Sequence, residues 1–392
     1  MGERAPRLAK RVRDLSSSAT LEMTARARQL AAQGKSVVNF AAGELDFDTP
    51  DFIKKAAIAA LNQGFTKYTP AAGTAELKEA VSEKFQRENG LSYSPNQIVV
   101  SCGAKHSLFN LIQVLCDAGE EVLFPSPYWV SYPEMVRLAQ AIPVTIPTSP
   151  GSQYKITADQ LRGKITPKAR LLLLNSPSNP TGTVYSKEEL QAIARVIVEK
   201  DLFCISDEIY EKILYDGARH YSIASFGEDI YCRTATVNGV SKSFSMTGWR
   251  IGYLGAPEWV VKAVTNYQSH STSNPTSISQ KGALAAIKAD EKEVLNMLAP
   301  LEERRSLMLS ELGTIKSIQF FPPMGAFYVF CNISKTAMDS VTFATRLLEE
   351  TGVVTVPGEA FGDRYGLRLS FAASKSDIQE GMKRLKKFVE GL

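Results

Sequence analysis

Residues 97–124 read QIVVSCGAKHSLFNLIQVLCDAGEEVLF and carry the pattern that decides the fold. A short apolar run, QIVVS, is followed by a stretch with helical spacing, GAKHSLFNLIQVLC, and then by a second apolar run, EVLF. Short apolar runs that alternate with helices predict parallel strands that are buried on both faces of a sheet. The fold class expected from this stretch is α/β.

The same alternation continues to about residue 240. Its later apolar runs and helical stretches are SYPEMVRLAQ (131–140), IPVTIP (142–147), ARLLLLN (169–175), SKEELQAIARVIVEKD (186–201), FCISDE (203–208) and TATVNGV (234–240). Beyond Pro257 the chain becomes mostly helical and then mixes strands with helices, which is typical of a second, α+β unit. We expect a large domain over residues 46–300 and a small domain over 301–392, to which residues 1–45 contribute.

Length and composition indicate a globular protein and argue against several functional classes. The chain has 392 residues, more than one ordinary core accommodates, so two or three domains are expected. Hydrophobic residues make up 44% and charged residues 22%, a balance typical of soluble domains. The net charge is only +4 and no basic stripe with interleaved aromatic residues occurs, so no nucleic-acid partner is expected. The sequence contains no run of eighteen apolar residues, so no membrane span is expected.

Cysteine and histidine usage predicts neither a disulfide framework nor a metal site. The five cysteines are odd in number and widely spaced, and the three histidines are scattered along the chain. Unpaired cysteines are typical of a reducing compartment, so we expect a cytoplasmic protein. The Arg-rich start, MGERAPRLAKRVRDLSSS, lacks the apolar core of a secretory signal and leaves a transit peptide as the alternative.

Small and polar residues follow three of the apolar runs, at the strand ends where open α/β sheets bind ligands. The turn Ser101 to Lys105 opens a helix, whose backbone N–H groups and positive end suit a phosphate; a plain helix start is the alternative. Trp129, after EVLF, could stack on an aromatic ring or belong to the core. Asn179 belongs to NPTG, a rigid turn that presents an amide but that also needs these residues for its own geometry.

Two charged residues follow the next two apolar runs. Asp207 ends an apolar strand, where a carboxylate is costly unless a cation or hydrogen bonds compensate it; a protonated pyridine nitrogen would be such a cation. Lys242 lies in SKSFSMTGWRIGY (241–253), directly after TATVNGV. A lysine near a buried site can lose its proton and form a Schiff base with a carbonyl group. A surface lysine is the alternative, but five such groups on successive strand ends favour one cofactor pocket.

Several motifs together resemble the class I pyridoxal-phosphate aminotransferases of fold type I. They cover nearly the whole chain and are AGELDFDTP (42–50), NPTG (179–182), SDEIY (206–210), SKSFSMTGWRIGY (241–253) and RLS (368–370). The prokaryotic aspartate aminotransferase subgroup is the most similar, through TKYTPAAG (66–73) and SPYWVSYPEMVR (126–137). The resemblance implies a large domain with a mostly parallel seven-stranded sheet, a smaller α+β domain and pyridoxal 5'-phosphate as cofactor.

The resemblance implies that amino groups pass from L-aspartate to 2-oxoglutarate by a ping-pong mechanism. Three rivals remain open. One is an aminotransferase for aromatic or neutral amino acids, and a second is a carbon–sulfur or decarboxylating lyase of the same fold. The third is a cofactor-binding regulatory domain, although no helix-turn-helix segment is visible in the sequence.

The resemblance also implies catalytic and cofactor-binding roles at matching positions. Lys242 would form the Schiff base and move a proton, Asp207 would pair with the ring nitrogen, and Tyr210 and Asn179 would donate to the ring oxygen. Trp129 would stack on the ring. The phosphate would be bound by Gly103, Ala104, Lys105, Ser241 and Arg250, and by Tyr68 of a neighbouring subunit, so a homodimer with shared sites is implied.

A further set of residues is implied for the amino acid and 2-oxo acid substrates. Arg368 would bind the α-carboxylate with its planar fork, and Gly43 would meet the same group through its backbone. Lys105 would serve the distal carboxylate, and Trp129 and Asn179 complete the set. Members that also use prephenate carry a lysine near the start of the chain where this sequence has Ser16, so prephenate activity is not expected.

Overall fold

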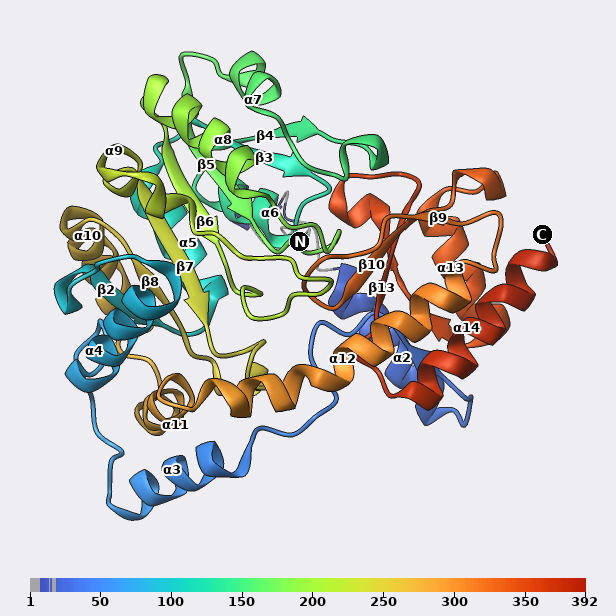
Figure 1. Ribbon diagram of the computed structural model, residues 1–392, viewed down its shortest axis with the longest axis horizontal. Helices are drawn as coiled ribbons and strands as arrows, with labels where there is room; N and C mark the ends of the chain where they lie inside the picture. The colour runs from blue at the N-terminus through green and yellow to red at the C-terminus, as the bar shows by residue number, and fades with distance from the viewer. Residues whose placement is uncertain (1–7, 14, 16–18) are drawn as a thin grey trace, which may run out of the picture.

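The computed structural model describes residues 8–13, 15 and 19–392, and it confirms the predicted α/β fold class (Figure 1). Its main sheet has seven strands in the order β2-β8-β7-β6-β5-β3-β4. These strands are β2 (Ile98–Ser101), β3 (Glu121–Ser126), β4 (Ile142–Pro147), β5 (Ala169–Asn175), β6 (Phe203–Asp207), β7 (Thr234–Gly239) and β8 (Gly252–Gly255). Strands β4, β3, β5, β6 and β7 lie side by side in this order and are parallel to one another. Strand β8 is antiparallel to both β2 and β7.

Helices cover both faces of this sheet, as the unbroken apolar runs predict. Along β5, Leu171 and Leu173 share one buried cluster with residues of α5, α6 and α10, whereas Leu172 and Leu174 share another with residues of α7, α8 and α9. Successive strand residues point to opposite faces, so a run of leucines fills both layers. The helices of this part are α3 (Asp51–Asn62), α4 (Ala75–Lys84), α5 (Ala104–Leu115), α6 (Ser131–Leu138), α7 (Ala158–Lys164), α8 (Lys187–Glu199), α9 (Glu228–Tyr231), α10 (Glu258–Ser269) and α11 (Ser277–Ile287).

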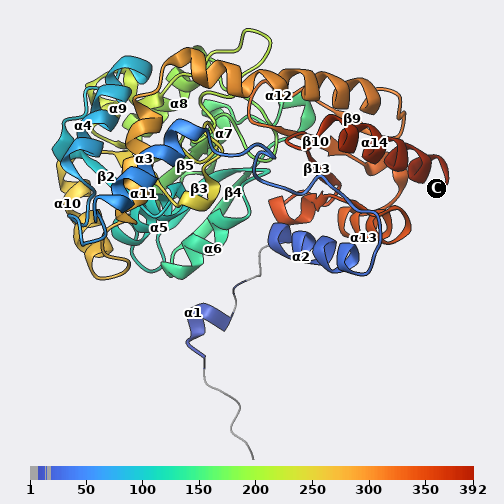
Figure 2. The same cartoon turned by 90° about the horizontal axis from the view of Figure 1, so that it is seen from below.

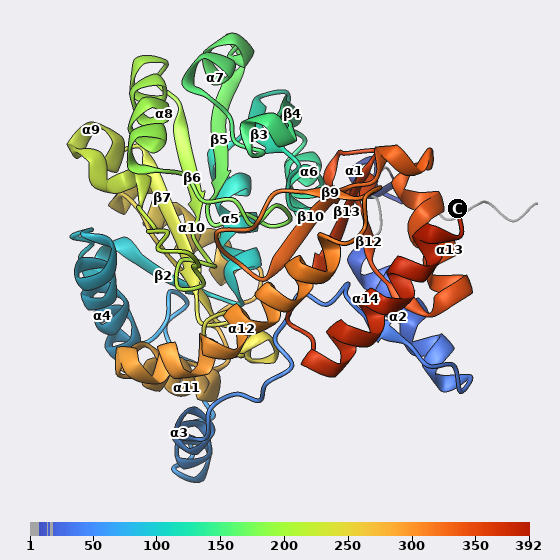
Figure 3. The same ribbon diagram turned by 45° about the vertical axis from the view of Figure 1, so that its right-hand side comes forward.

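A smaller α+β part lies beside the main sheet (Figure 3). Its antiparallel sheet has the order β12-β13-β10-β9, and a separate parallel pair joins β1 from the N-terminal segment to β11. The strands are β1 (Val38–Asn39), β9 (Gln319–Phe320), β10 (Tyr328–Asn332), β11 (Val353–Val354), β12 (Val356–Pro357) and β13 (Gly366–Ser370). The remaining helices are α1 (Lys10–Arg13), α2 (Ala19–Ala32), α12 (Glu291–Leu312), α13 (Ser340–Thr351) and α14 (Lys375–Glu390).

The long helix α12 runs from the main sheet to the smaller part (Figure 2). The expected boundary at residue 300 falls inside this helix, at Pro300, and the exact domain limits stay a prediction. Within the described part of the chain, none of the helices combines the length and the apolar character needed to cross a bilayer.

The antiparallel strand β8 runs against the turn that opens α5. Gly252 pairs with Ser101 on one side and with Gly239 on the other. A Cβ atom at position 252 would overlap the backbone of Gly103 and Ala104. The absence of a side chain at Gly252 therefore lets the end of the sheet approach this turn.

We predict that Gly252→Ala lowers the free energy of unfolding by about 1–3 kcal/mol, because the added methyl group must displace backbone atoms. Urea denaturation measures this loss. The matched control is Gly248→Ala, since a Cβ atom there meets nothing within 4 Å. Equal stability of the two variants would contradict the close approach.

Candidate active site

The carboxyl ends of three neighbouring parallel strands bring together the predicted polar residues. β5 ends at Asn175, which lies beside Asp207 at the end of β6. β7 pairs with β6 and leads directly to Ser241 and Lys242. Because the ends of parallel strands meet at one edge, residues far apart in the sequence converge there.

Lys242 projects a partly buried amine into this edge. Its Nζ atom donates to the carbonyl oxygen of Gly43 at 2.5 Å and lies 5.8 Å and 6.0 Å from the ring centroids of Tyr210 and Phe327. Burial lowers the pKa of Lys242 to about 8, against a smaller opposing effect of the Glu44 carboxylate. About a tenth of the amine is therefore neutral at pH 7, which suits a nucleophile or a proton acceptor.

Asp207 supplies a buried carboxylate near this amine. Burial raises its pKa to about 6, while a hydrogen bond from the hydroxyl of Tyr132 to Oδ2, 2.8 Å long, opposes the rise. The group is thus mostly ionised at pH 7, although burial makes that charge costly. A cation or protonated nitrogen that bound here would remove much of the cost.

Arg368 contributes a buried cation to the site. Its guanidinium donates to Oδ1 of Asn179 at 2.9 Å and to the carbonyl of Ala41 at 2.8 Å, and it lies 4.4 Å from the ring centroid of Tyr328. Its Nε atom is buried without a hydrogen-bond partner among the described residues. These contacts orient the planar fork but leave its charge unneutralised, which suits a carboxylate ligand.

Tyr210 and Asn179 are held by further hydrogen bonds. The hydroxyl of Tyr210 lies 2.9 Å from that of Tyr328, and burial raises the pKa of Tyr210 well above its usual value. Asn175 accepts from the backbone N–H of Asn179 at 2.8 Å and donates to the carbonyl of Asp207 at 2.8 Å. Both Tyr210 and Asn179 therefore keep donor groups near the site in defined places.

The turn before α5 forms a cradle for an anion. Gly103 has a φ of 91° and immediately precedes the helix, so Ala104 and Lys105 lie in its first turn. Arg250 reaches this turn and donates to the carbonyl of Cys102 at 3.2 Å and to that of Thr247 at 2.8 Å. A Cβ atom at position 103 would lie 2.5 Å from Nη2 of Arg250. A helix N-terminus beside a guanidinium favours a phosphate.

Trp129 lies beside Lys105 of this turn, whereas Tyr68 is exposed to solvent. Trp129 packs its ring edge-on against Tyr132, with centroids 5.4 Å apart, and the ring centroid lies 4.9 Å from Nζ of Lys105. Tyr68 is 91% exposed on a loop, so this single chain does not bring it into the site. Ser16 lies outside the described residues.

Sequence reasoning missed Tyr132 and Tyr328. Tyr132 follows Trp129 by three residues and lies in the first turn of α6, so both ring systems lie near the same turn. This spacing was the available signal for Tyr132. Tyr328 lies at the start of a buried strand in an aromatic run, where nothing distinguishes it from a core residue.

Comparisons with known proteins agree over almost the full chain. The family model for aminotransferase class I and II matches residues 35–385. An aspartate aminotransferase of Bacillus sp. (strain YM-2) is 47% identical over 388 residues, covering 98% of this chain and 99% of that protein. An aspartate/prephenate aminotransferase of Nitrosomonas europaea is 44% identical over 391 residues, covering 97% and 98%. The solved structure of aspartate aminotransferase from Thermus thermophilus with maleate has 44% identity and a TM-score of 0.94, covering 98% and 100%.

We predict that Tyr132→Phe raises the pKa of Asp207 by about one unit, because the carboxylate loses a charge-stabilising hydrogen bond. Carbon-13 NMR titration of protein labelled at aspartate measures the shift, with Asp207→Asn to assign the signal. Tyr185→Phe is the matched control, since it removes another buried hydroxyl, one that accepts from the backbone of Ile156. An unchanged Asp207 titration in Tyr132→Phe would show that this hydroxyl does not tune the carboxylate.

Proposed function

This chain belongs to the aminotransferase class I and II family, and from that membership we propose that it converts L-aspartate and 2-oxoglutarate to oxaloacetate and L-glutamate. The two substrates would react in turn at one site, by a ping-pong mechanism. The observation that carries the proposal is the Lys242 amine, whose pKa burial lowers to about 8 at a strand end shared with Asp207. An amine that is partly neutral near pH 7 can both attack a carbonyl group and move protons.

Pyridoxal 5'-phosphate is the proposed cofactor, and the residues present fit it. When bound, it supplies an aldehyde that condenses with amines and a ring that delocalises negative charge. Asp207 would bind the ring nitrogen, Trp129 would contact the ring face, and Tyr210 and Asn179 would donate to its oxygen. The phosphate would be bound by Gly103, Ala104, Lys105, Ser241 and Arg250.

Lys242 and Asp207 would divide the proton chemistry. The Nζ atom of Lys242 would accept the proton from the substrate's α carbon and would donate it to the carbon of the cofactor's aldehyde group. The ionised carboxylate of Asp207 would hold a proton at the ring nitrogen, where positive charge is needed. The pKa values of about 8 and about 6 leave each group able to do its part near pH 7.

Arg368 would bind the α-carboxylate that amino acids and 2-oxo acids share. Asn179 and Ala41 fix its guanidinium before the substrate arrives, which lowers the entropic cost of binding. Gly43 would contact the same carboxylate through its backbone. Lys105 would meet the distal carboxylate of a dicarboxylic substrate, and prephenate is not proposed as a substrate because position 16 is serine.

A homodimer with shared sites is part of the proposal. Tyr68 is 91% exposed, and Ile58 and Leu61 on α3 are 56% and 51% exposed. Such a set on one region of the chain suits an interface between copies, across which Tyr68 would reach the partner's phosphate. Sedimentation velocity at micromolar concentration tests this, and a monomer that retains full activity would contradict it.

We also propose a cytoplasmic location and a division into a large and a small domain. The five cysteines are all free in the structure, which supports a reducing compartment such as the cytoplasm. The large cofactor-binding domain would span residues 46–300, and the small domain would comprise residues 301–392 with the contribution of residues 1–45.

A panel of amino donors with 2-oxoglutarate tests the function directly. Aspartate should be the best donor and should yield oxaloacetate in equal amount to glutamate. Preference for phenylalanine or tyrosine would favour an aromatic aminotransferase instead. Release of ammonia, sulfide or carbon dioxide without glutamate would indicate a lyase.

We predict that Arg368→Ala raises KM for every amino donor by about 30-fold or more, because each loses a charged contact worth about 2 kcal/mol. The comparison variant is Lys105→Ala, which should raise KM for aspartate and glutamate more than for alanine. Steady-state kinetics over these donors distinguishes the two residues. A loss confined to aspartate in Arg368→Ala would contradict its assignment to the α-carboxylate.

A further inference from the structure

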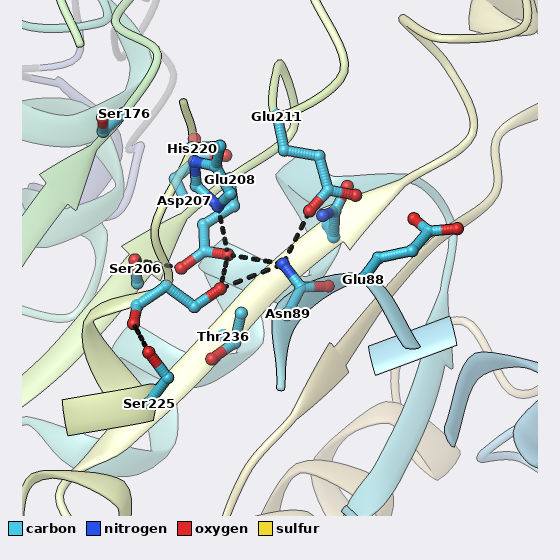
Figure 4. Close-up of polar contacts among 12 residues, drawn as sticks. Glu88, Asn89, Ser176, Ser206, Asp207, Glu208, Glu211, His220, Ser225 and Thr236 are labelled. Carbon is cyan, nitrogen blue, oxygen red and sulfur yellow. Dashed lines mark hydrogen bonds and ion pairs between the residues drawn. The ribbon is translucent and has the colours of Figure 1, made fainter. Parts of the chain in front are cut away.

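A buried charged cluster lies next to Asp207, and the proposed chemistry does not use it (Figure 4). It contains two carboxylates, two basic groups and an amide, with exposed fractions of 9% or less for each side chain. Its members are Lys84, Asn89, Glu208, Glu211 and His220. Charges are rarely buried without a purpose or a partner, because desolvation costs several kcal/mol per ion.

Glu208 directly follows Asp207 and contacts polar groups of two segments, the end of β6 and residues 220–222. Its Oε2 atom lies 2.9 Å from Nε2 of His220 and accepts from the hydroxyl of Ser222 at 2.5 Å. Its Oε1 atom accepts from the hydroxyl of Ser206 at 2.8 Å. The carboxylate is thus held beside the last residues of β6.

Glu211 is bound from the other side by α4 and the π-helical segment Phe85–Asn89. Lys84 forms an ion pair with Glu211 and also donates to Oδ1 of Asn89 at 2.8 Å. The Asn89 amide donates to Glu211 at 2.7 Å and lies 3.4 Å from Glu208. Asn89 therefore links the two carboxylates, as Figure 4 shows.

A metal ion is a poor occupant for this cluster. Ligand atoms of Glu208, Glu211 and His220 do lie within 4.8 Å of one another. However, the Lys84 ammonium already bonds Glu211, and the imidazole Nε2 is already engaged with Glu208. The cluster carries its own cations in place of a metal.

The charges balance if His220 is protonated. Burial alone would lower the pKa of His220, but the carboxylates of Glu208 and Glu211 together outweigh it and raise the pKa above the usual 6.5. Burial would likewise raise the pKa of Glu211, but Lys84, His220 and Asn89 together outweigh it and lower the pKa to about 2. The Lys84 ammonium and a protonated His220 then face the carboxylates of Glu211 and Glu208.

The neighbouring ionisable groups do not supply another counter-charge for Glu208. Near Asp207 they are Tyr132, Tyr210 and Lys242. Around the cluster they are Tyr93, Cys204, Tyr253 and Glu88. Glu88 forms ion pairs with Lys212 and Arg87, and its carboxylate also lies 3.6 Å from Nζ of Lys84. The negative charge of Glu208 is one of the causes that raise the pKa of Asp207, so the cations beside Glu208 oppose that rise.

We propose that Lys84 and His220 balance the charge of Glu208 and Glu211 so that the adjacent carboxylate of Asp207 stays ionised at the pocket. The residues of the cluster do not contact the substrate. They act by influencing the ionisation of the Asp207 carboxylate. This inference rests on the proposed function, because an ionised Asp207 matters where a ring nitrogen binds it.

The test measures the dissociation constant of pyridoxal 5'-phosphate from pH 5 to 9 by absorbance titration. Affinity should fall at acid pH as Asp207 gains a proton. His220→Gln and Lys84→Gln, which each remove a cation, should move the midpoint of that fall upward by about half a unit to one unit of pH. Glu211→Gln removes an anion while Lys84 keeps Glu88 as a partner, so it should move the midpoint downward.

The double variant Lys84→Gln/Glu211→Gln is the matched control, since it removes one charge of each sign. Its midpoint should stay near that of the unmodified protein. If Lys84→Gln fails to fold, His220→Gln tests the loss of a cation alone. Midpoints that do not move, or that all move in one direction regardless of the charge removed, would overturn the proposal. A protein that binds the cofactor but transfers no amino group would instead contradict the proposed function and leave this test intact.

Discussion

The desolvation of the Lys242 amine is the constraint on which the site depends. A lysine in water holds its proton well above neutral pH, whereas burial at the end of β7 lowers the pKa to about 8. The sheet achieves this because β5, β6 and β7 are parallel and end at one edge. Two further groups lie against the amine. They are the backbone carbonyl of Gly43 in the N-terminal segment and the ring of Phe327, the residue before β10.

The rest of the site compensates the charges that this burial leaves in a poorly solvated place. Asp207 is supported by a tyrosine hydroxyl, and Arg368 by an amide, a carbonyl and an aromatic ring. Neither has its charge neutralised by these contacts, so each retains a reason to bind a ligand of opposite charge. Protein contacts thus fix the orientation of these groups, and the cofactor and substrate would supply the missing charges.

The pattern of apolar runs in the sequence predicted the fold well, but sequence patterns identified only some of the residues of the site. The apolar runs predicted the strands because buried parallel strands need apolar residues on both faces, as the leucines of β5 illustrate. The antiparallel direction of β8 was not predicted, because direction depends on the connection rather than on composition. Tyr132 and Tyr328 were missed since their roles depend on contacts with residues 75 and 118 positions away. The same holds for Lys84, whose partner Glu211 is 127 positions distant.

We propose that Lys242 is the residue that binds the cofactor covalently. Borohydride reduction of the protein after incubation with pyridoxal 5'-phosphate, followed by peptide mass spectrometry, tests this proposal most directly. We predict that the reduced phosphopyridoxyl group is found on the peptide that contains Lys242. Its recovery on Lys105 or any other lysine, with Lys242 unmodified, would contradict the account.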